Sequence, residues 1–204
     1  LTEAARRHSE DLIFMDAQSH TGSDGSTVGE RTRDAGYSWN RIAENIYAYG
    51  ASAWQAHAAF NIDWGMGPGG MQDPPGHRLT IMGAREGQDF REIGVGILEE
   101  TAPSTDVGPL VVTHNFGRRN GATFLTGVVY EDLDGNGFFS PGEGIEGVTV
   151  TPDTGDAWGV TSASGGYAVP LHFVDPETLT FDGNALPDPV SVPVNPRGDR
   201  KSVV

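Results

Sequence analysis

The sequence predicts an α+β protein built from two parts, a helix-rich part over residues 1–120 and a small all-β part over residues 121–204. Apolar residues recur at helical spacing in the first part, whereas they alternate at every second position in the last third. The composition changes after the turn-rich segment GRRNGAT at 117–123. A chain of 204 residues is long enough for two modest domains. We therefore expect a domain boundary near residue 120.

The chain up to about residue 100 is expected to be mostly helical, beginning with an apolar stripe at helical spacing over residues 1–15. His8 lies on that stripe, so its imidazole is expected to pack in the core. Trp39, Trp54 and Trp64 are also expected to be core residues, because large aromatic side chains contribute most when they are buried.

Two capping signals predict the starts of further helices. In a capping box, a hydroxyl residue and a Glu or Gln three positions later each accept a hydrogen bond from the other's backbone N–H. Thr27 with Glu30 predicts a short helix. Ser52 with Gln55 predicts a helix that continues to about Trp64.

A long turn over 65–76 leads to a helix that is expected from Pro75 to Met82. The segments EIGVGILEE at 92–100 and LVVTHNFG at 110–117 predict two strands, since both are rich in β-branched residues.

Residues 121–204 are expected to form a small β-sandwich from short strands separated by Gly, Pro and Asp turns. The alternating apolar positions are Val148 and Val150; Tyr167, Val169, Leu171 and Phe173; and Val190, Val192 and Val194. Side chains at every second position share one face of a strand, so the pattern predicts one buried face per strand.

The net charge of −15 argues against nucleic acids and anionic membranes as partners, since both require basic patches. Residues 121–204 are the more acidic part, with 12 acidic and 3 basic side chains and thus a net charge of −9. The absence of cysteine excludes disulfides and thiolate chemistry. No apolar run reaches the ~20 residues of a membrane span, so no transmembrane segment is expected. Because the sequence starts within a helical pattern, we expect that an N-terminal piece precedes it; the oligomeric state stays open.

The segment DLDGNGFFSPGE at 132–143 matches the calcium loop of an EF-hand at its diagnostic positions, including the glycine at position 6. The expected ligands are Asp132, Asp134, Asn136, Phe138 (through its carbonyl), Ser140 and Glu143. An ordinary Asp- and Gly-rich hairpin turn is the alternative. Since the flanking segments FLTGVVY and GVTV predict strands rather than helices, a bound Ca²⁺ is expected to stabilise the fold and not to act as a sensor.

Several motifs of the first part occur in a recognisable order. They are AARRH at 4–8, SHTGSDGST at 19–27, RTRDAGYSWNRIAENI at 31–46, GHR at 76–78, IGVG at 93–96 and THNFG at 113–117. Together they resemble the CAP superfamily (cysteine-rich secretory proteins, antigen 5 and pathogenesis-related proteins; SCP-like), in particular its cysteine-free bacterial branch. The resemblance implies a secreted or cell-surface bacterial protein whose domain over 1–120 is an α-β-α sandwich.

The same resemblance implies a cleft that holds two histidines and two acidic residues, which in some members bind a divalent metal such as zinc. His20 and Glu44 match the first histidine and the first acid. His77 of GHR is the candidate for the second histidine, and Asp73 is the candidate for the second acid. Two imidazoles with carboxylates suit Zn²⁺, but the same groups can instead form a hydrogen-bonded network without a metal.

The second part resembles the calcium-binding, prealbumin-like β-modules of bacterial surface proteins, mainly through the loop at 132–143. For the whole chain the leading hypothesis is a non-enzymatic role through the His/Glu cleft, either binding of a lipid, a cell-envelope component or another ligand, or mediation of extracellular interactions. A zinc-dependent hydrolase of a peptide, ester or glycan, using His20, His77 and Glu44, is the rival. Neither a GxSxG nor an HExxH motif is present. A purely structural surface module is the third hypothesis.

Overall fold

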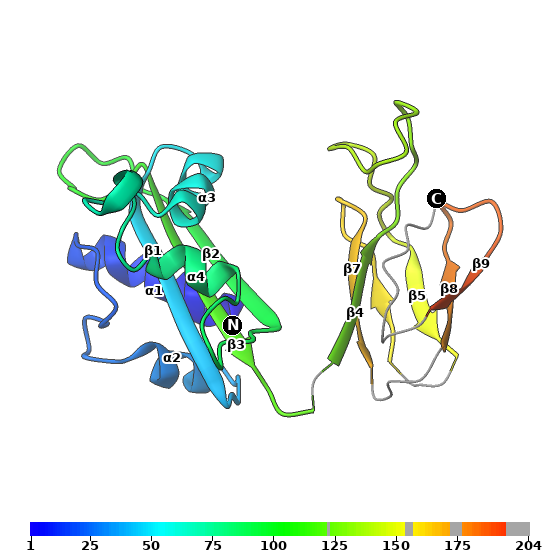
Figure 1. Cartoon of the computed structure of the whole chain (residues 1–204), viewed down its shortest axis with the longest axis horizontal. Helices are drawn as coiled ribbons and strands as arrows, with labels where there is room; N and C mark the ends of the chain where they lie inside the picture. The colour runs from blue at the N-terminus through cyan, green and yellow to red at the C-terminus, as the bar shows by residue number, and fades with distance from the viewer. Residues whose placement is uncertain (122, 154–156, 172–176, 195–204) are drawn as a thin grey trace. The chain divides into compact units, whose positions relative to one another are not determined.

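The chain divides into two compact units, Leu1–Asn120 and Gly121–Val204, in a computed structural model (Figure 1). The structure describes residues 1–121, 123–153, 157–171 and 177–194. Helices and antiparallel strands both occur, so the predicted α+β class is confirmed. No helix in the described part is long and apolar enough to cross a membrane.

The first unit combines four α-helices with one antiparallel sheet. The helices are α1 Thr2–Met15, α2 Val28–Asp34, α3 Ala53–Ile62 and α4 Gly76–Ile81, with a short 3-10 turn at Pro68–Gly70. The strands are β1 Arg41–Gly50, β2 Glu92–Glu99 and β3 Leu110–Arg118, in the spatial order β1-β3-β2. The expected helices at both capping signals and both expected strands are present.

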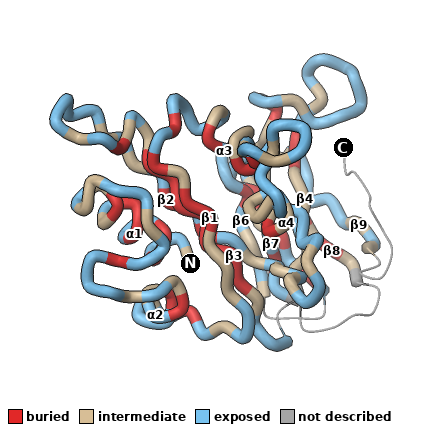
Figure 2. The backbone as a smooth tube through the Cα atoms, turned by 60° about the vertical axis from the view of Figure 1, so that its left-hand side comes forward, coloured by how far each residue is buried: buried red, intermediate tan, exposed pale blue. Residues whose placement is uncertain are grey.

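Helices cover both faces of this sheet. Figure 2 shows α1 and α2 on one side and α3 and α4 on the other. The central strand β3 is buried along most of its length, and its side chains alternate between the layers. Val111 packs with Leu12 of α1, whereas Val112 packs with Phe60 of α3. Side chains of successive strand residues therefore enter different layers, which matters for the site described below.

The expectation of a mostly helical chain up to residue 100 is wrong for β1. This strand pairs with β3 in an antiparallel register, irregular between Tyr47 and Gly50, that sets Glu44 opposite Asn115 and Asn45 opposite His114. Pairing with the distant strand β3 stabilises the extended conformation of residues 41–50. The local pattern of apolar residues does not indicate such a long-range partner.

The tryptophans also depart from expectation. Trp54 is 80% exposed and Trp64 is 51% exposed, while Trp39 is half-buried and donates its indole N–H to the carbonyl of Gly29 at 3.2 Å. The buried face of α3 is formed by Ala56 and Phe60, so Trp54 has no core to enter.

Local capping follows the sequence closely. Thr27 and Glu30 form the full capping box, and His8 is completely buried, as expected. The Ser52 hydroxyl accepts the Gln55 N–H at 3.1 Å, but the Gln55 carboxamide instead accepts the N–H of Ala51, so the second box is only half formed. Helix α3 ends at Ile62, two residues earlier than expected, and α4 begins at Gly76 rather than at Pro75.

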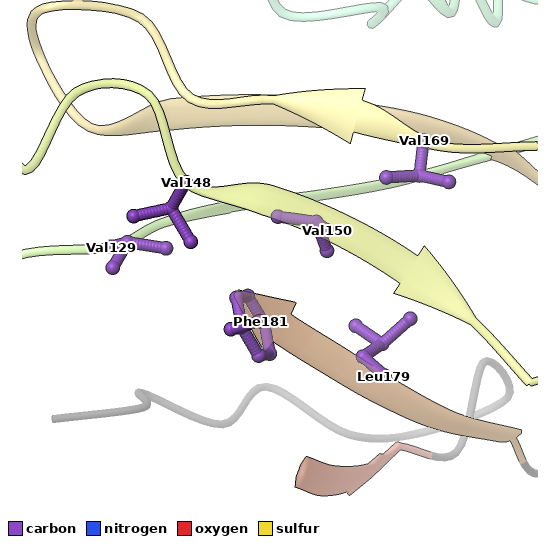
Figure 3. Packing of buried hydrophobic residues seen from close by; sticks show 6 residues of the cluster. All are labelled: Val129, Val148, Val150, Val169, Leu179 and Phe181. Carbon is purple, nitrogen blue, oxygen red and sulfur yellow. The ribbon is translucent and has the colours of Figure 1, made fainter. Parts of the chain in front are cut away.

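The second unit contains strands and no helix within its described residues. The strands are β4 Thr123–Val128, β5 Thr149–Pro152, β6 Gly159–Val160, β7 Gly166–Leu171, β8 Glu177–Asp182 and β9 Val190–Val194. They form a β4–β7 sheet and a β6-β5-β8-β9 sheet, and both supply the core seen in Figure 3. Val150 of β5 and Val169 of β7 are fully buried in that core. Phe173, one of the expected alternating positions, lies outside the described residues.

Candidate functional site

The first of two imidazole–carboxylate pairs joins His20 to Glu44. His20 lies in the loop after α1, and its Nδ1–H donates to Glu44 Oε1 at 2.9 Å. The Glu44 side chain is 1% exposed, and its other oxygen accepts from Arg31 Nη2 at 2.8 Å. Arg31 of α2 also donates to the carbonyl of Ser26 at 2.7 Å. The buried negative charge of Glu44 is thus matched by a guanidinium.

Two further side chains from the helix and sheet approach the same carboxylate. His8 Nε2 lies 3.6 Å from Glu44 Oε1 and donates its hydrogen to the carbonyl of Ser19 at 2.9 Å. Burial, partly offset by Glu44, lowers the pKa of His8, so this imidazole is neutral at pH 7. The Asn115 amide, oriented with its nitrogen toward Glu44, donates to Oε2 at 3.1 Å. Every oxygen of Glu44 therefore has a partner, and the group ties α1, α2, β1 and β3 together.

The second pair joins His77 to Asp63, on the other face of the sheet. Asp63 ends α3 in a left-handed conformation (φ 58°) and is completely buried. Its Oδ1 accepts His77 Nδ1–H at 2.7 Å, and its Oδ2 accepts the backbone N–H groups of His77 at 2.8 Å and of Arg78 at 3.4 Å. Because a carboxylate only accepts, Asp63 fixes the His77 tautomer with its proton on Nδ1. Nε2 of His77 is left free to accept a hydrogen bond, a proton or a metal.

A cavity of about 210 Å³ lies beside this second pair. Its lining residues are Gln18, Ile46, Tyr47, Ala59, Phe60, Asp63, Trp64, Gln72 and His77. The walls thus combine apolar and aromatic surface with polar groups, namely two carboxamides, the Asp63 carboxylate, the His77 imidazole and the polar atoms of Tyr47 and Trp64. The His77 side chain is 25% exposed, and its ring lies 5.4 Å from that of Phe60. Such a cavity suits a small group with one apolar face and a few hydrogen-bonding atoms.

Edge strand β1 connects the two pairs. Glu44 and Asn45 are consecutive, so their side chains point to opposite faces of the sheet. Glu44 binds His20 on the α1 face, whereas the Asn45 amide donates to the carbonyl of His77 at 3.2 Å on the α4 face. The two histidines named by the sequence therefore belong to separate groups on opposite faces of one strand.

The acid in contact with His77 is not the sequence candidate Asp73. Asp73 is exposed, and the carboxylate that contacts His77 is that of Asp63. The signal that identifies Asp63 is its place at the end of α3, directly before Trp64 and Gly65, since Asp tolerates the left-handed conformation that ends a helix. Within the described residues, no three of His20, Glu44, Asp63 and His77 bring ligand atoms within 4.8 Å of one another.

A further histidine lies buried in the sheet. His114 of β3 is 7% exposed, and its Nδ1 has no hydrogen-bond partner among the described residues. Burial, with a smaller effect of nearby His57, lowers the pKa of His114 to about 4. The His57 ring is exposed on α3, and its centroid lies 6.4 Å from that of His114.

The loop at 132–143 brings three carboxylates together. Ligand oxygens of Asp132, Asp134 and Glu143 all lie within 4.8 Å of one another. Glu143 is 5% exposed and accepts the backbone N–H of Leu133 at 3.0 Å and of Ser140 at 2.6 Å. These bonds fold the loop so that its first and last carboxylates meet. The clustered acidic oxygens are the donor type that Ca²⁺ prefers.

The remaining predicted ligands take part in the same loop. The Asn136 amide donates to Asp134 at 2.9 Å and to the Ser140 hydroxyl at 3.2 Å. Gly137 adopts a left-handed conformation with φ 76°, as the sharp turn at position 6 requires. The Phe138 side chain is 75% exposed, so only its backbone can serve the loop.

Comparison with known proteins yields one weak likeness. No family model matches the chain, and no curated protein matches it. Among solved structures, the chain is similar to a 1.5 Å crystal structure of an extracellular protein containing an SCP domain from Bacillus anthracis, with 22% identity over 58% of this chain and a TM-score of 0.42. The chain spans 31% of the length of that protein.

Proposed function

We propose that the first unit is a CAP-like domain of a secreted or cell-surface bacterial protein, and that it binds a small extracellular ligand without catalysis. The observation that carries this proposal is the imidazole of His77, fixed by buried Asp63 at the wall of a 210 Å³ cavity. The His20–Glu44 pair is assigned a structural role, because Arg31 and Asn115 satisfy its carboxylate.

Cavity size limits the ligand. Pockets for drug-sized molecules measure about 300–1,000 Å³, so 210 Å³ accommodates a single ring or a short chain. Tyr47, Phe60 and Trp64 offer apolar and aromatic surface, and His77 offers a hydrogen-bond acceptor at Nε2. One end of a cell-envelope glycan or of a lipid has this chemistry and size.

Indole N–H signals in NMR spectra test the proposal directly, because Trp64 lines the cavity. We expect titration with either N-acetylglucosamine or octanoate to shift the Trp64 signal, while the signals of Trp39, Trp54 and Trp158 stay in place. His77→Gln is expected to abolish the shift, and His20→Gln is expected to preserve it. If neither probe moves Trp64, the ligand-binding proposal fails and a purely structural module becomes the better account.

Zinc binding is a separate proposal, for which His20, Glu44, His77 and Asp73 are the sequence candidates and Asp63 is the additional acid. Calorimetric titration of Zn²⁺, with calcium saturating throughout, should be run on the intact chain and on His20→Ala and His77→Ala. Loss of heat in His77→Ala alone supports a site at the cavity; loss in His20→Ala alone supports one at Glu44. No heat in the intact chain contradicts a zinc site.

Hydrolysis is the rival function, and one observation favours it. A carboxylate that holds Nδ1–H at 2.7 Å leaves Nε2 placed to take a proton from water, as a general base does. The probe is p-nitrophenyl acetate. Turnover that is lost in His77→Gln and in Asp63→Asn, but kept in His20→Gln, supports the hydrolase; equal rates in all four proteins contradict it.

For the second unit we propose a prealbumin-like β-module stabilised by Ca²⁺ at Asp132, Asp134, Asn136, Phe138, Ser140 and Glu143. Three clustered carboxylates repel one another, and a divalent cation removes that repulsion. At the roughly 10⁻⁴ to 10⁻³ M affinities of extracellular sites, calcium outside cells keeps such a loop occupied.

A further inference from the structure

The second unit contains a cavity of its own, with a volume of about 560 Å³. Residues 129–132, which lead into the 132–143 loop, and Ile145, which follows it, form one wall, and residues 185–187 before β9 form another. The main apolar lining residues are Val129, Tyr130, Ile145, Phe181, Leu186 and Val190. Val129 and Phe181 also belong to the hydrophobic core in Figure 3, so the cavity reaches down to the core of the unit. This volume falls within the range of about 300–1,000 Å³ that is typical of small-molecule pockets.

Two carboxylates complete the lining. Asp132 accepts the backbone N–H groups of Asn136 at 3.1 Å and Gly137 at 2.9 Å, so it is engaged within its loop. Glu131 is exposed, and its carboxylate forms no hydrogen bond or ion pair with any described residue. A carboxylate without a partner among the described residues therefore lies at a largely apolar cavity.

Acidic side chains predominate in the unit that holds this cavity, since residues 121–204 carry a net charge of −9. Across residues 121, 123–153, 157–171 and 177–194, the described part of this unit, every charged side chain is acidic. A Ca²⁺ ion in the loop would leave a net charge of −1 on Asp132, Asp134 and Glu143, and Glu131 would stay uncompensated. A positively charged ligand is attracted to the cavity with or without that ion, and an anionic ligand is repelled.

We propose that this cavity binds a small cationic amphiphile, with its apolar body against Phe181 and Leu186 and its charged nitrogen beside Glu131. Burial of the apolar body supplies most of the affinity, and Glu131 selects the sign of the head group. The site is independent of the ligand proposed for the His77 cavity, because it uses only residues of the second unit.

Two probes with the same tail and opposite heads test the proposal on the full chain. Decyltrimethylammonium and decyl sulfate, both below their micellar concentrations and in saturating calcium, are titrated by calorimetry. We expect the ammonium ion to bind at least about fivefold more tightly than the sulfate, since their tails are equal and their head groups carry opposite charges. Nuclear Overhauser contacts from the decyl chain to the Tyr130 and Phe181 rings should locate it in the cavity.

Matched variants separate the cavity from the charge. Ala185→Trp places an indole on an exposed lining residue and is expected to weaken binding of the ammonium probe at least tenfold, whereas Ala163→Trp, on an exposed turn outside the lining, should leave it unchanged. Glu131→Gln should make the affinities for the two probes nearly equal. Glu146→Gln should preserve the preference for the ammonium probe.

Several results would overturn this assignment. If the ammonium probe does not bind to the intact chain, or if both Trp variants lose binding equally, the cavity is not the binding site. If the intact chain binds both probes with equal affinity, the cavity does not select a cation. Because Ala185 and Glu131 are exposed, their variants are expected to keep the melting temperature of the intact chain, and a retained melting temperature shows that lost binding reflects the cavity rather than unfolding.

Discussion

The two imidazole–carboxylate pairs of the first unit look alike in the sequence but differ in what surrounds them. Glu44 is buried with Arg31 against one oxygen, and its imidazole partner His20 has a side chain that is 60% exposed. Asp63 is buried and has no guanidinium partner in the described part of the chain; His77 and two backbone N–H groups hold it beside a cavity. The first arrangement stabilises the fold, and the second orients an imidazole toward space that a ligand can fill.

The difference follows from how each carboxylate is compensated. A buried carboxylate needs a cation or several hydrogen bonds, because desolvation disfavours its charge. The Arg31 guanidinium offsets the negative charge of Glu44 and occupies one of its oxygens. We therefore assign Glu44 a structural role. Asp63 is satisfied by hydrogen bonds that all converge on the start of α4, so its effect is to fix the orientation of His77.

The largest expected effect is that of Glu44→Gln. The substitution leaves Arg31 buried without its counter-ion, and breaking a buried ion pair costs about 3–5 kcal/mol of unfolding free energy. Urea denaturation of the first unit measures it. Glu10→Gln, an exposed partner of Arg6, should change the stability by less than about 0.5 kcal/mol. A loss of unfolding free energy below about 1 kcal/mol for Glu44→Gln would contradict the structural role of the Glu44–Arg31 pair.

The pH dependence of stability tests the burial of His114, an imidazole with no carboxylate partner among the described residues. Burial lowers the pKa of His114 to about 4, against an unfolded value near 6.5, so the unfolded state binds more protons between these values. We therefore expect the free energy of unfolding to rise from pH 4 to pH 6.5, with at most about 3 kcal/mol from His114. His8, whose pKa burial also lowers, contributes with the same sign.

The His114→Leu variant isolates that contribution in urea denaturation at a series of pH values. The slope between pH 4 and pH 6.5 should become shallower, because a leucine binds no proton in either state. His57→Leu, which changes the exposed neighbour, should retain most of the slope. An unchanged slope in His114→Leu would show that His114 does not contribute to the acid sensitivity, which His8 and the carboxylates would then set.

The carboxylates of the 132–143 loop, unlike Glu44, have no cationic side chain among their described neighbours. Addition of Ca²⁺ therefore tests whether a metal ion stabilises them. At 10 mM Ca²⁺ and the affinities of extracellular sites, roughly 10⁻⁴ to 10⁻³ M, the second unit should gain about 1–3 kcal/mol of stability. Differential scanning calorimetry with and without chelator measures the shift. Asp132→Ala should abolish it, while Asp188→Ala, an exposed acid outside the loop, should not. An identical melt in calcium and in chelator would refute the calcium proposal.

The smallest expected effects separate the two histidines themselves. His20→Gln should lower the unfolding free energy by less than about 1 kcal/mol, because its side chain is largely exposed and Arg31 remains on Glu44. His77→Gln should cost about 1 kcal/mol while abolishing the response of Trp64 to ligand. Urea titrations and indole NMR signals provide both readouts. Loss of the Trp64 response in His20→Gln would show that the two pairs act as one site.

Much of the local structure was predictable because its causes lie within a few residues. The full capping box of Thr27 and Glu30 and the turn at Gly137 depend on contacts between near neighbours in the chain. The strands β2 and β3 were predictable from their local composition, although their pairing is long-range. His20 and Glu44 could be named from their motifs, and the structure brings them together at 2.9 Å.

The remaining features depend on partners that are distant in sequence. Residues 41–50 are extended because β3 lies beside them, and Trp54 is exposed because Ala56 and Phe60 form the buried face of α3. Asp63 reaches His77, 14 residues away, only because α3 ends in a left-handed turn. The sequence by itself therefore determined the α+β class, the caps and the chemistry available to the chain. The tertiary structure decided which acid meets which histidine and which pair faces a cavity, since burial and long-range pairing exist only once the elements have packed.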